Sequence, residues 1–458
     1  MSSNWSVKKL GDLVTFLSGG TPSKSNKDYW NGEIPWISAS SMQSTRYHDS
    51  DLRVTSLGST NGTRLVPAET VLLLVRGGAL HNKIPVGITT REVTFNQDVK
   101  ALVPKSEDIT PYYLLAWLIS SRELLLGKVE NTGIGAGKLD TKILQDLDVP
   151  VPPKAELLRL ELFSKALDDK IILNQNINHT LEQMAQALFK SWFVDFEPVK
   201  AKMAVLEAGG SQEDATLAAM AAISGKDAYA LAVFEREHPE QYAELKTTAE
   251  LFPSAMQDSE LGEIPEGWSI KPLDGIATYQ NGLALQKFRP ENENDFLPVV
   301  KIAQLKKGFS DGEEKASPNI KPECIIDNGD VVFSWSGSLM VDIWCGGKAA
   351  LNQHLFKVSS TKYPKWLYYK YTAHHLIEFQ RIAEAKAVTM GHIKREHLSQ
   401  AKCLMPSSET VHAFTPFFEP VLNKVISNRL ETRKLENIRD TLLPKLLSGE
   451  ITLPEAEQ

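Results

Sequence analysis

The sequence of 458 residues is poor in cysteine and has no long apolar run. Its three cysteines, Cys324, Cys345 and Cys403, form no CxxC pair, which argues against a zinc knuckle and a disulfide framework. Apolar runs such as Val71–Val75 have the length of a strand, whereas a membrane helix needs about 20 residues. The N-terminal stretch Met1–Lys9 is polar and holds no signal-peptide core. We therefore expect a cytoplasmic protein that does not enter a membrane.

Motifs of enzymatic chemistry are absent as well. No Asn-Pro or Asp-Pro-Pro occurs, so the loop with which amino-methyltransferases hold a flipped base is not found. His374-His375 and His392 belong to no HExxH motif. The loop Gly133–Leu139 has three residues between its outer glycines and no Ser or Thr after Lys138, so it is not a P-loop. It predicts a turn, either structural or approaching DNA phosphates at Gly135. We expect no catalysis, metal or cofactor in this chain.

The acidic side chains are concentrated in one segment. The net charge is −7, from 50 basic and 57 acidic residues. Residues 200–266 hold 5 basic and 13 acidic residues, whereas residues 1–153 hold 16 and 15, and residues 267–406 hold 18 and 14. The two largest blocks are therefore neutral to basic, and a DNA-contacting face on them remains open.

The chain contains an internal repeat. Trp5–Lys8 returns as Trp268–Lys271, 263 residues later, and an offset of 254 holds without a gap for Gly137–Phe193. Ten positions of this second stretch are identical in the two copies, more than chance predicts. Repeats of this kind mark a duplicated structural unit. The sequence therefore consists of a unit of about 195 residues, an acidic insert, and the unit again.

Each copy begins with sheet-forming segments and ends in a long helix. Strand-like runs with Gly, Pro and Asn breaks include Thr70–Val75, Ile84–Ile88 and Asp330–Trp335. Helices are predicted at Tyr112–Leu126 and Trp366–Ile377. Prolines then end the block, and a helix follows. The insert predicts short helices at Glu213–Ile223, Ala228–Glu237 and Gln241–Leu251, as an arm that contacts a partner or as a solvated connector.

The long helices carry an apolar stripe with a mean step of about 3.56 residues, between the coiled-coil and free-helix values. Its positions are Leu160, Phe163, Leu167, Ile171, Asn174, Ile177, Leu181, Met184, Leu188 and Trp192 in the first copy, and Phe417, Val421, Val425, Asn428, Leu435, Ile438, Leu442 and Leu446 in the second. Glu431 interrupts the second stripe. A polar residue in an apolar seam costs stability and fixes register. We expect Asn174 and Asn428 to align two packed helices. The alternative is that each Asn is solvated or forms a hydrogen bond with the backbone.

Several motifs resemble those of the specificity (S) subunits of type I restriction–modification systems. Gly19–Ser23, Tyr29–Gly32 and Ile34–Ser38 are similar to the opening of a target recognition domain in that family. Leu188–Pro198 is similar to the end of its central spacer helix, and Asp258–Trp268 to the entry of its second recognition domain. One departure is Ala155-Glu156, where many relatives carry Glu-Gln.

The resemblance implies an α+β fold, with two similar sheet-containing target recognition domains separated by two long helices that pack as an antiparallel, coiled-coil-like rod. We predict residues 1–153 as target recognition domain 1, 154–199 as the central spacer helix, 200–266 as the acidic helical insert, 267–406 as target recognition domain 2, and 407–458 as the C-terminal spacer helix and tail. Each recognition domain would recognise one half of a bipartite site in double-stranded DNA.

The resemblance also implies partners. Two methyltransferase (M) subunits would dock on the helices, and optional restriction (R) subunits would cut DNA, so S-adenosylmethionine, ATP and magnesium belong to those subunits. The helix-seam and partner positions predicted here are Leu167, Asn174, Leu181, Leu188, Trp192, Val421, Asn428, Leu435 and Leu442. A self-sufficient methyltransferase or nuclease, or a scaffold that binds no DNA, are the rival hypotheses.

Base recognition should come from loop residues that differ between the two copies. The candidates are Ser40, Ser41, Arg76, Lys83 and Lys138 in the first copy and Lys301, Gln304, Ser336, Lys386 and His392 in the second. The paired amides Asn96-Gln97 and Asn352-Gln353 occur in both. Such amides can recognise adenine, but because both copies share them, a role in a strand-end turn is favoured.

Overall fold

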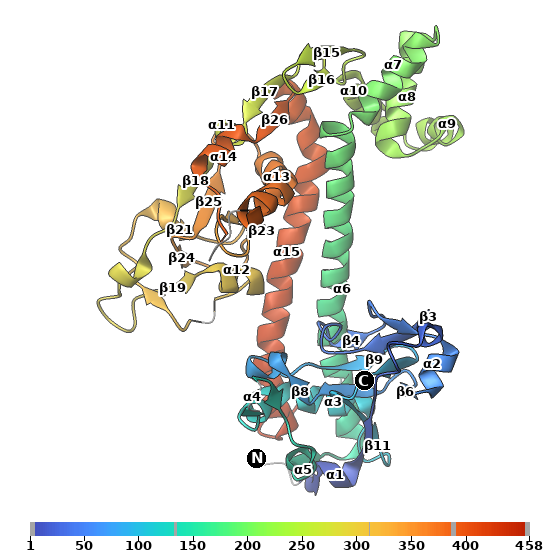
Figure 1. The fold of residues 1–458 in the computed structure, drawn as a ribbon, viewed down its shortest axis with the longest axis vertical. Coiled ribbons are helices and arrows are strands. Elements are labelled where there is room, and N and C mark those ends of the chain that lie inside the picture. The colour runs from blue at the N-terminus through green and yellow to red at the C-terminus, as the bar shows by residue number, and fades with distance from the viewer. Residues whose placement is uncertain (1–4, 132–134, 311, 386–390, 454–458) are drawn as a thin grey trace. The chain divides into compact units, whose positions relative to one another are not determined.

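The computed structural model describes residues 5–131, 135–310, 312–385 and 391–453. Contacts divide the chain into two compact units, unit 1 with residues 1–173 and 432–458 and unit 2 with residues 174–431. The two longest helices, α6 (Lys154–Phe193) and α15 (Ser408–Leu447), each have 40 residues and contribute one part to each unit (Figure 1).

Unit 1 begins with a mixed sheet region. Its strands are β1 (Ser6–Lys9), β2 (Val14–Ser18), β3 (Trp30–Ile37), β4 (Arg46–Tyr47), β5 (Arg53–Val54), β6 (Arg64–Val66), β7 (Val71–Leu74), β8 (Arg76–Gly77), β9 (Val86–Thr89), β10 (Val93–Phe95), β11 (Val99–Pro104), β12 (Glu130–Asn131), β13 (Gly137–Lys138) and β14 (Asp148–Val151). Its helices before α6 are α1 (Leu10–Leu13), α2 (Ser56–Thr60), α3 (Pro111–Ser120), α4 (Arg122–Leu126) and α5 (Thr141–Gln145), with 3₁₀ turns at Lys27–Tyr29 and Gly78–His81.

The core of unit 1 lies between its sheets and the helices. The main sheet has the order β2-β11-β7-β9-β4, and a second has the order β5-β3-β10-β6. All four residues of β7 are buried, which explains their unbroken aliphatic run. Thr110 caps α3 by accepting from the Tyr113 N–H. The α6 residue Leu160 and the α15 residue Leu443 belong to the same apolar cluster.

Unit 2 repeats this plan. Its strands are β15 (Met256–Ser259), β16 (Gly262–Pro265), β17 (Ser269–Pro272), β18 (Thr278–Asn281), β19 (Leu297–Val300), β20 (Lys315–Ala316), β21 (Ile325–Ile326), β22 (Val331–Ser334), β23 (Met340–Ile343), β24 (Ala349–Leu351), β25 (Leu355–Ser359) and β26 (Lys402–Met405). Its shorter helices are α7 (Glu197–Glu207), α8 (Gln212–Ser224), α9 (Ala228–Glu237), α10 (Pro239–Glu250), α11 (Leu273–Ile276), α12 (Ile302–Lys307), α13 (Lys365–Ala385) and α14 (Arg395–Gln400), with 3₁₀ turns at Leu285–Lys287 and Pro322–Cys324. Its sheets have the orders β18-β25-β22-β23 and β20-β19-β24-β21.

The two units share their strand registers. β1 pairs with β14 and β17 with β26, both antiparallel, and Ser6 faces Val151 as Ser269 faces Met405. These residues are related by the offsets of 263 and 254 found in the sequence. The parallel pairs β3–β10 and β19–β24 also correspond. The predicted internal repeat and the α+β fold class with two sheet regions and two long helices are therefore confirmed.

Gly19 and Gly282 lie at equivalent places in the two copies, where only glycine fits. A Cβ on Gly19 would lie 2.2 Å from the Phe95 carbonyl oxygen, and a Cβ on Gly282 would lie 2.2 Å from that of Leu351. Any side chain would collide with main chain there, because the strands approach too closely.

The buried face of the long helices is a heptad seam, and it corrects part of the predicted stripe. In α6 the buried positions Leu157, Ser164, Ile171, Asn178, Ala185 and Trp192 recur every seven residues, and Leu160, Leu167, Asn174, Leu181 and Leu188 fall between them. The predicted Met184 is instead 59% exposed, and in α15 Ile438 is 41% exposed whereas its neighbour Arg439 is 7% exposed. The prediction was wrong by one residue at these points because it chose the larger apolar neighbour of a small or polar seam residue.

The helices of the insert were predicted in part. α9 has the predicted bounds, and α8 and α10 differ from theirs by at most two residues. α7 was missed. The predicted helix Tyr112–Leu126 is divided at Ser121 into α3 and α4. Within the described residues no single helix is long and apolar enough to cross a membrane, although the bent pair α8 and α9 passes that test by length and composition.

Candidate nucleic-acid interface

In unit 1 the predicted basic residues lie on one group of loops. β8 and β13 pair antiparallel, and Arg76 faces Lys138. Arg76 is exposed, while the ammonium of Lys138 lies 2.9 Å from the Asp140 carboxylate. Gly135 is exposed with a φ of +76°, and its carbonyl oxygen is 3.0 Å from Nε2 of His81. The predicted turn thus lies beside a cationic strand pair.

A second loop of unit 1 adjoins the first. The exposed Lys83 donates to the side-chain oxygen of Gln43 at 3.2 Å, and the Gln43 amide donates to the Ser40 carbonyl at 2.9 Å. The Ser41 hydroxyl is engaged with the backbone, because it accepts from the Ser38 N–H at 2.9 Å and donates to the Ser38 carbonyl at 3.0 Å. Ser41 therefore shapes the loop, and Ser40, Gln43 and Lys83 form its exposed face.

A buried ion pair holds this loop to α6. The guanidinium of Arg46, directly after the loop, contacts the carboxylates of Asp168 and Asp169. The Arg46 and Asp168 side chains are only 12% and 5% exposed, and the Thr45 hydroxyl also donates to Asp168 at 2.8 Å. A charge buried this deeply needs its partner, so the loop position depends on the helix.

Unit 2 has the same strand pair with different side chains. Ser336 and His392 form an antiparallel bridge, which corresponds to the Arg76–Lys138 pair. His392 follows Lys138 by the offset of 254, and Ser336 follows Arg76 by 260 residues, the offset that relates β22 to β7. Ser336 is 3% exposed, and its hydroxyl lies 3.0 Å from Nδ1 of His354. His392 is exposed, and the ring of Trp335 lies 6.4 Å from its ring. A cationic pair in one unit is therefore a Ser–His pair in the other.

The loop of unit 1 that contains Ser38 and Ser41 also has a counterpart in unit 2. The Gln304 side-chain oxygen accepts from the Lys301 N–H at 3.2 Å, just as Ser41 accepts from Ser38, 263 residues earlier. The Lys301 ammonium also contacts the Glu314 carboxylate. Gln304 thus has the capping role of Ser41, while Lys301 offers a cation where unit 1 has Ser38.

The shared amides hold equivalent turns. Asn96 is 7% exposed and Asn352 is 6% exposed. Their side-chain oxygens accept from the N–H two residues on, that of Asp98 at 3.1 Å and that of His354 at 3.2 Å. This geometry agrees with the turn interpretation that the sequence favoured.

The glutamines next to these amides reach outward. Gln97 is exposed and accepts from the Thr21 hydroxyl at 2.7 Å. Gln353 is half-buried, and its amide nitrogen lies 3.4 Å from Nε2 of His354. The turns are therefore common to both units, whereas the side chains that leave them differ.

Sequence reasoning missed Gln43, His81, Trp335 and His354, which lie among the predicted residues. His81 could have been found because it lies in the sequence between two predicted cations. His354 follows the echoed Asn-Gln pair, where unit 1 has Asp98. Lys386, also predicted, lies outside the described residues.

The helix seam of unit 2 is bridged by polar side chains. The amide of Asn174 donates to the Glu431 carboxylate at 2.9 Å, and that of Asn428 donates to the Asn178 side-chain oxygen at 2.9 Å. The Asn178 amide donates to the Val425 carbonyl at 3.1 Å. Glu431, which interrupts the apolar stripe, is thus the partner of Asn174, and the pairing order shows that α6 and α15 run antiparallel here.

The remaining seam predictions lie on the same helix faces. Asn174, Asn428 and Trp192 are buried at 0–1% exposure, and Leu181, Leu188 and Val421 are half-buried in unit 2. Leu167, Leu435 and Leu442 are half-buried in unit 1.

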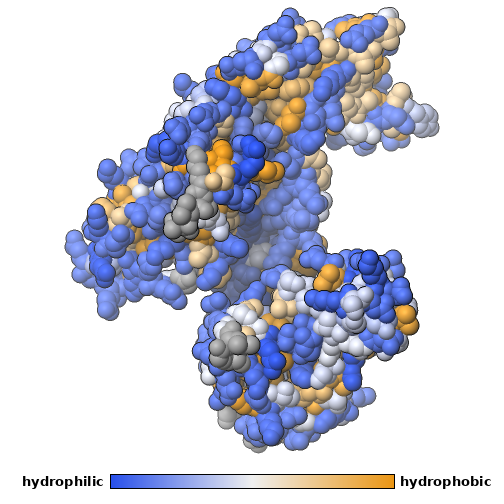
Figure 2. Space-filling model, in the orientation of Figure 1, coloured by the Kyte–Doolittle hydropathy of each residue, from blue (hydrophilic) through white to orange (hydrophobic). Residues whose placement is uncertain are grey.

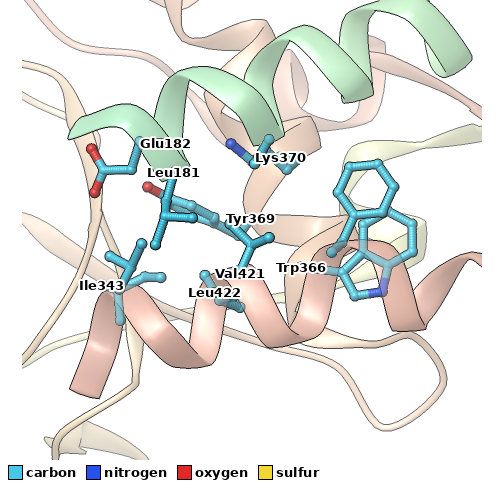
Figure 3. A pocket seen from close by; sticks show the side chains of 11 residues that line it. Leu181, Glu182, Ile343, Trp366, Tyr369, Lys370, Val421 and Leu422 are labelled. Atoms are coloured by element: carbon cyan, nitrogen blue, oxygen red, sulfur yellow. The ribbon is translucent and has the colours of Figure 1, made fainter. Parts of the chain in front are cut away.

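An ion network joins the second sheet region to the seam. The Arg429 guanidinium of α15 lies 2.9 Å from the Glu182 carboxylate of α6 and 2.7 Å from the Asp342 carboxylate of β23. A small pocket opens beside it, with Leu181 and Glu182 on α6, Val421 and Leu422 on α15, and Trp366, Tyr369 and Lys370 on α13 around it (Figure 3). Burial lowers the pKa of Lys370, and nearby Glu182 opposes that shift.

Unit 1 contains a comparable buried charge. Glu436 is the residue that the offset of 254 relates to Glu182, and burial raises its pKa while the nearby Arg439 opposes the shift. Burial lowers the pKa of Arg122, which lies close to Arg439. The ion pairs that tie a sheet region to the helices are Arg46–Asp168 in unit 1 and Arg429–Asp342 in unit 2. Among the described residues, no three His, Cys, Asp or Glu side chains gather in a way that could hold a metal ion.

Comparison with known proteins relates this chain to one protein family. The chain matches the family described as "Type I restriction modification DNA specificity domain" over residues 2–183 and 265–438. It is 30% identical over 362 residues to the specificity subunit of the type I restriction enzyme HindI of Haemophilus influenzae, with 76% of this chain and 79% of that protein covered. It is 25% identical over 466 residues to the MjaIX specificity subunit of Methanocaldococcus jannaschii, covering 99% and 94%. The solved S subunit of a type I restriction–modification system from M. genitalium aligns over 97% of this chain and 96% of that one, with 12% identity and a TM-score of 0.49.

Proposed function

Because the chain belongs to the type I restriction–modification DNA specificity family, we propose that its two sheet regions each recognise one half of a bipartite site in double-stranded DNA. The chain is the DNA-recognition subunit of such a system. In the proposed assignment the loops around Arg76 recognise one half-site and those around His392 the other.

The observation that supports this assignment is that the two units share the same backbone arrangement at these loops but carry different side chains on it. The Arg76–Lys138 and Ser336–His392 strand pairs occupy equivalent positions. Recognition of different sequences requires different donors and acceptors at the base edges, on a backbone of the same shape. The paired positions meet this requirement, because unit 1 carries two cations there, whereas unit 2 carries the exposed imidazole of His392 beside a buried Ser336.

The side chains divide into two roles in this proposal. Buried or backbone-bonded residues position the loops, and these are Ser41, Asn96, Gln304, Ser336 and Asn352. Residues that project from the loops contact DNA, and these are Ser40, Arg76, Lys83, Gln97, Gly135, Lys138, Lys301, Gln353 and His392, with Gln43, His81 and His354 added by the structure.

The helices are proposed to bind two methyltransferase subunits. Beyond its seam, α6 exposes the large apolar side chains of Leu158, Leu162, Leu173 and Met184, at 46%, 67%, 51% and 59%. Apolar residues on an outer helix face indicate a protein contact. S-adenosylmethionine, ATP and magnesium would then be bound by the methyltransferase subunits and by any restriction subunits, and this cytoplasmic chain would itself be non-catalytic.

The test is a map of methylated bases with variants in one unit at a time. The assembled complex carrying Arg76→Ala and Lys138→Ala should lose discrimination in one half-site and keep the other. The complex carrying His392→Ala and His354→Ala should show the converse. Each well-placed contact contributes about 1–3 kcal/mol of discrimination.

Two controls sharpen the result. Lys362→Ala alters an exposed cation beyond the far end of β25 and should leave both half-sites unchanged. The purified chain alone should neither methylate nor cut DNA when S-adenosylmethionine, ATP and magnesium are supplied. If both half-sites change together in a single-unit variant, or the chain alone is active, the proposal fails.

A further inference from the structure

The acidic insert contains a small helical domain with an open apolar groove. Its core consists of Ala219, Met220, Leu231, Leu245 and Ala249, from α8, α9 and α10. On the outer side of these helices lies a hollow of about 410 Å³. In Figure 2 the surface over this part of the chain, at the upper right, shows orange and pale-orange atoms beside blue ones.

Both walls of the groove have the spacing of a helix-binding face. α8 contributes Asp214, Leu217, Ala218 and Ala221, and α9 contributes Ala228, Leu231, Ala232 and Glu235. Each set lies at positions i, i+3, i+4 and i+7, which form one stripe along a helix. The two stripes converge on the same hollow, with α8 and α9 bent by 86° relative to each other, so a helix that follows one stripe crosses the other.

The side chains of the groove are small. Four of its nine lining residues are alanines, so at these points another helix could approach closely and place larger apolar side chains into the hollow. Leu217 is 37% exposed, and Ala228 and Ala232 are exposed as well. Exposed apolar surface on two adjacent helices is typical of an interaction site.

The rim of the groove is acidic. Asp214 and Glu235 line it. Burial raises the pKa of Tyr242, which also lines the groove; the nearby Glu235 and Glu213 add to this shift, and Lys246 opposes it. Residues 200–266 hold 13 acidic and 5 basic residues. Such a field repels nucleic acid and favours a cationic partner.

We propose that the groove between α8 and α9 binds an amphipathic helix with basic flanks, supplied by another protein chain. Leucine-sized side chains at i, i+3, i+4 and i+7 of that helix would fill the apolar floor. Lysine or arginine side chains beside them would pair with Glu235 and Glu213 at the rim. This site lies outside the proposed DNA-contacting loops, so its existence does not depend on the function proposed above.

The experiment measures binding of a defined probe to the full-length chain. The probe is a fluorescent peptide of leucine and lysine, about four helical turns long, with its leucines at the required spacing. A peptide of the same composition in scrambled order is the control. Fluorescence anisotropy gives the Kd of each at low and at physiological salt, and hydrogen exchange reports whether α8 and α9 become protected.

Three variants test the site. Leu217→Glu should weaken binding of the patterned peptide by about tenfold or more, because it places a charge in the apolar floor. Glu235→Lys should weaken it by several-fold and flatten its salt dependence. Tyr229→Glu is the matched control, since Tyr229 is 81% exposed on α9 outside the groove, and it should bind as the wild type does.

The outcomes separate the alternatives. Tighter binding of the patterned peptide, with loss in Leu217→Glu and protection of α8 and α9, supports the proposal. Equal binding of both peptides, or wild-type binding by Leu217→Glu, would overturn it. If the chain is a dimer that Leu217→Glu converts to a monomer, a second copy fills the groove and the proposed occupant is wrong.

Discussion

Replacing the buried Asn pair of the seam should show strong energetic coupling. Asn428 donates its amide to the side-chain oxygen of Asn178 at 2.9 Å, and the two residues are 1% and 8% exposed. Asn428→Leu leaves a buried oxygen without this donor, and Asn178→Leu leaves a buried amide without this acceptor. Each single change should cost about 1–3 kcal/mol of unfolding free energy, the penalty of one unsatisfied buried polar group.

The double variant should behave differently from the sum of the singles. Asn178→Leu with Asn428→Leu removes both polar groups and adds apolar contact, so we expect a stability within about 1 kcal/mol of the wild type or above it. The coupling free energy should therefore be at least about 1 kcal/mol. The register of the two helices should become less specific, because a polar pair no longer selects it.

Urea unfolding followed by tryptophan fluorescence and by circular dichroism measures these values, and an unchanged m-value shows that the same surface unfolds. Asn176→Leu with Asn423→Leu, at exposed positions of the same helices, is the matched control and should be additive within about 0.5 kcal/mol. Singles that add up in the Asn178 and Asn428 pair would refute the reasoning, because the bond between them would then contribute nothing.

Three further predictions concern single residues. Burial, with the neighbouring histidine, lowers the pKa of His375 to about 4, so the folded chain holds fewer protons than the unfolded chain and stability falls as pH drops below about 6.5. Between about pH 7.5 and pH 5 this loss should reach about 2 kcal/mol in urea titrations, should vanish in His375→Asn, and should persist in the exposed control His412→Asn. Gly282→Ala, whose Cβ would lie 2.2 Å from a main-chain oxygen, should cost about 3 kcal/mol, whereas Gly127→Ala, with 3.5 Å of clearance, should cost less than about 1 kcal/mol by the same assay. Arg46→Met leaves two carboxylates unpaired and should cost about 3–5 kcal/mol; a loss below about 1 kcal/mol would show that the pair does not hold the loop.

The duplicated fold was predictable because identity at fixed offsets survives even where the chemistry has diverged. Ser6 and Ser269 could be aligned by eye, and their strand partners then followed. The helix seam was predictable only in part. Hydropathy locates Leu181 and Trp192, but it prefers Met184 to the smaller Ala185, although the seam accepts the small residue because a helix packs closely there.

The candidate interface was harder to predict, because it depends on which side chains the backbone already uses. Nothing in the sequence shows that Ser41 and Gln304 cap equivalent turns while Lys301 projects, or that Ser336 is buried against His354. Positions such as Arg76 and Ser336 become comparable only when the strand registers are known. The sequence indicates which residue types could bind DNA. The structure distinguishes the side chains that stabilise a loop from those that project from it.

The strand pairs β1–β14 and β17–β26 have an evolutionary consequence. Each pair joins the start of a sheet region to its end, so that the chain enters and leaves at neighbouring positions, with Ser6 opposite Val151 and Ser269 opposite Met405. The residues between these positions form a module whose two ends are held together by main-chain hydrogen bonds, and these do not depend on side-chain identity. Recombination between related genes at the codons of these strands would therefore exchange one entire module and leave the helices and the other module undisturbed. A change of DNA target would then need no gradual rebuilding of loops, since one crossover on each side suffices.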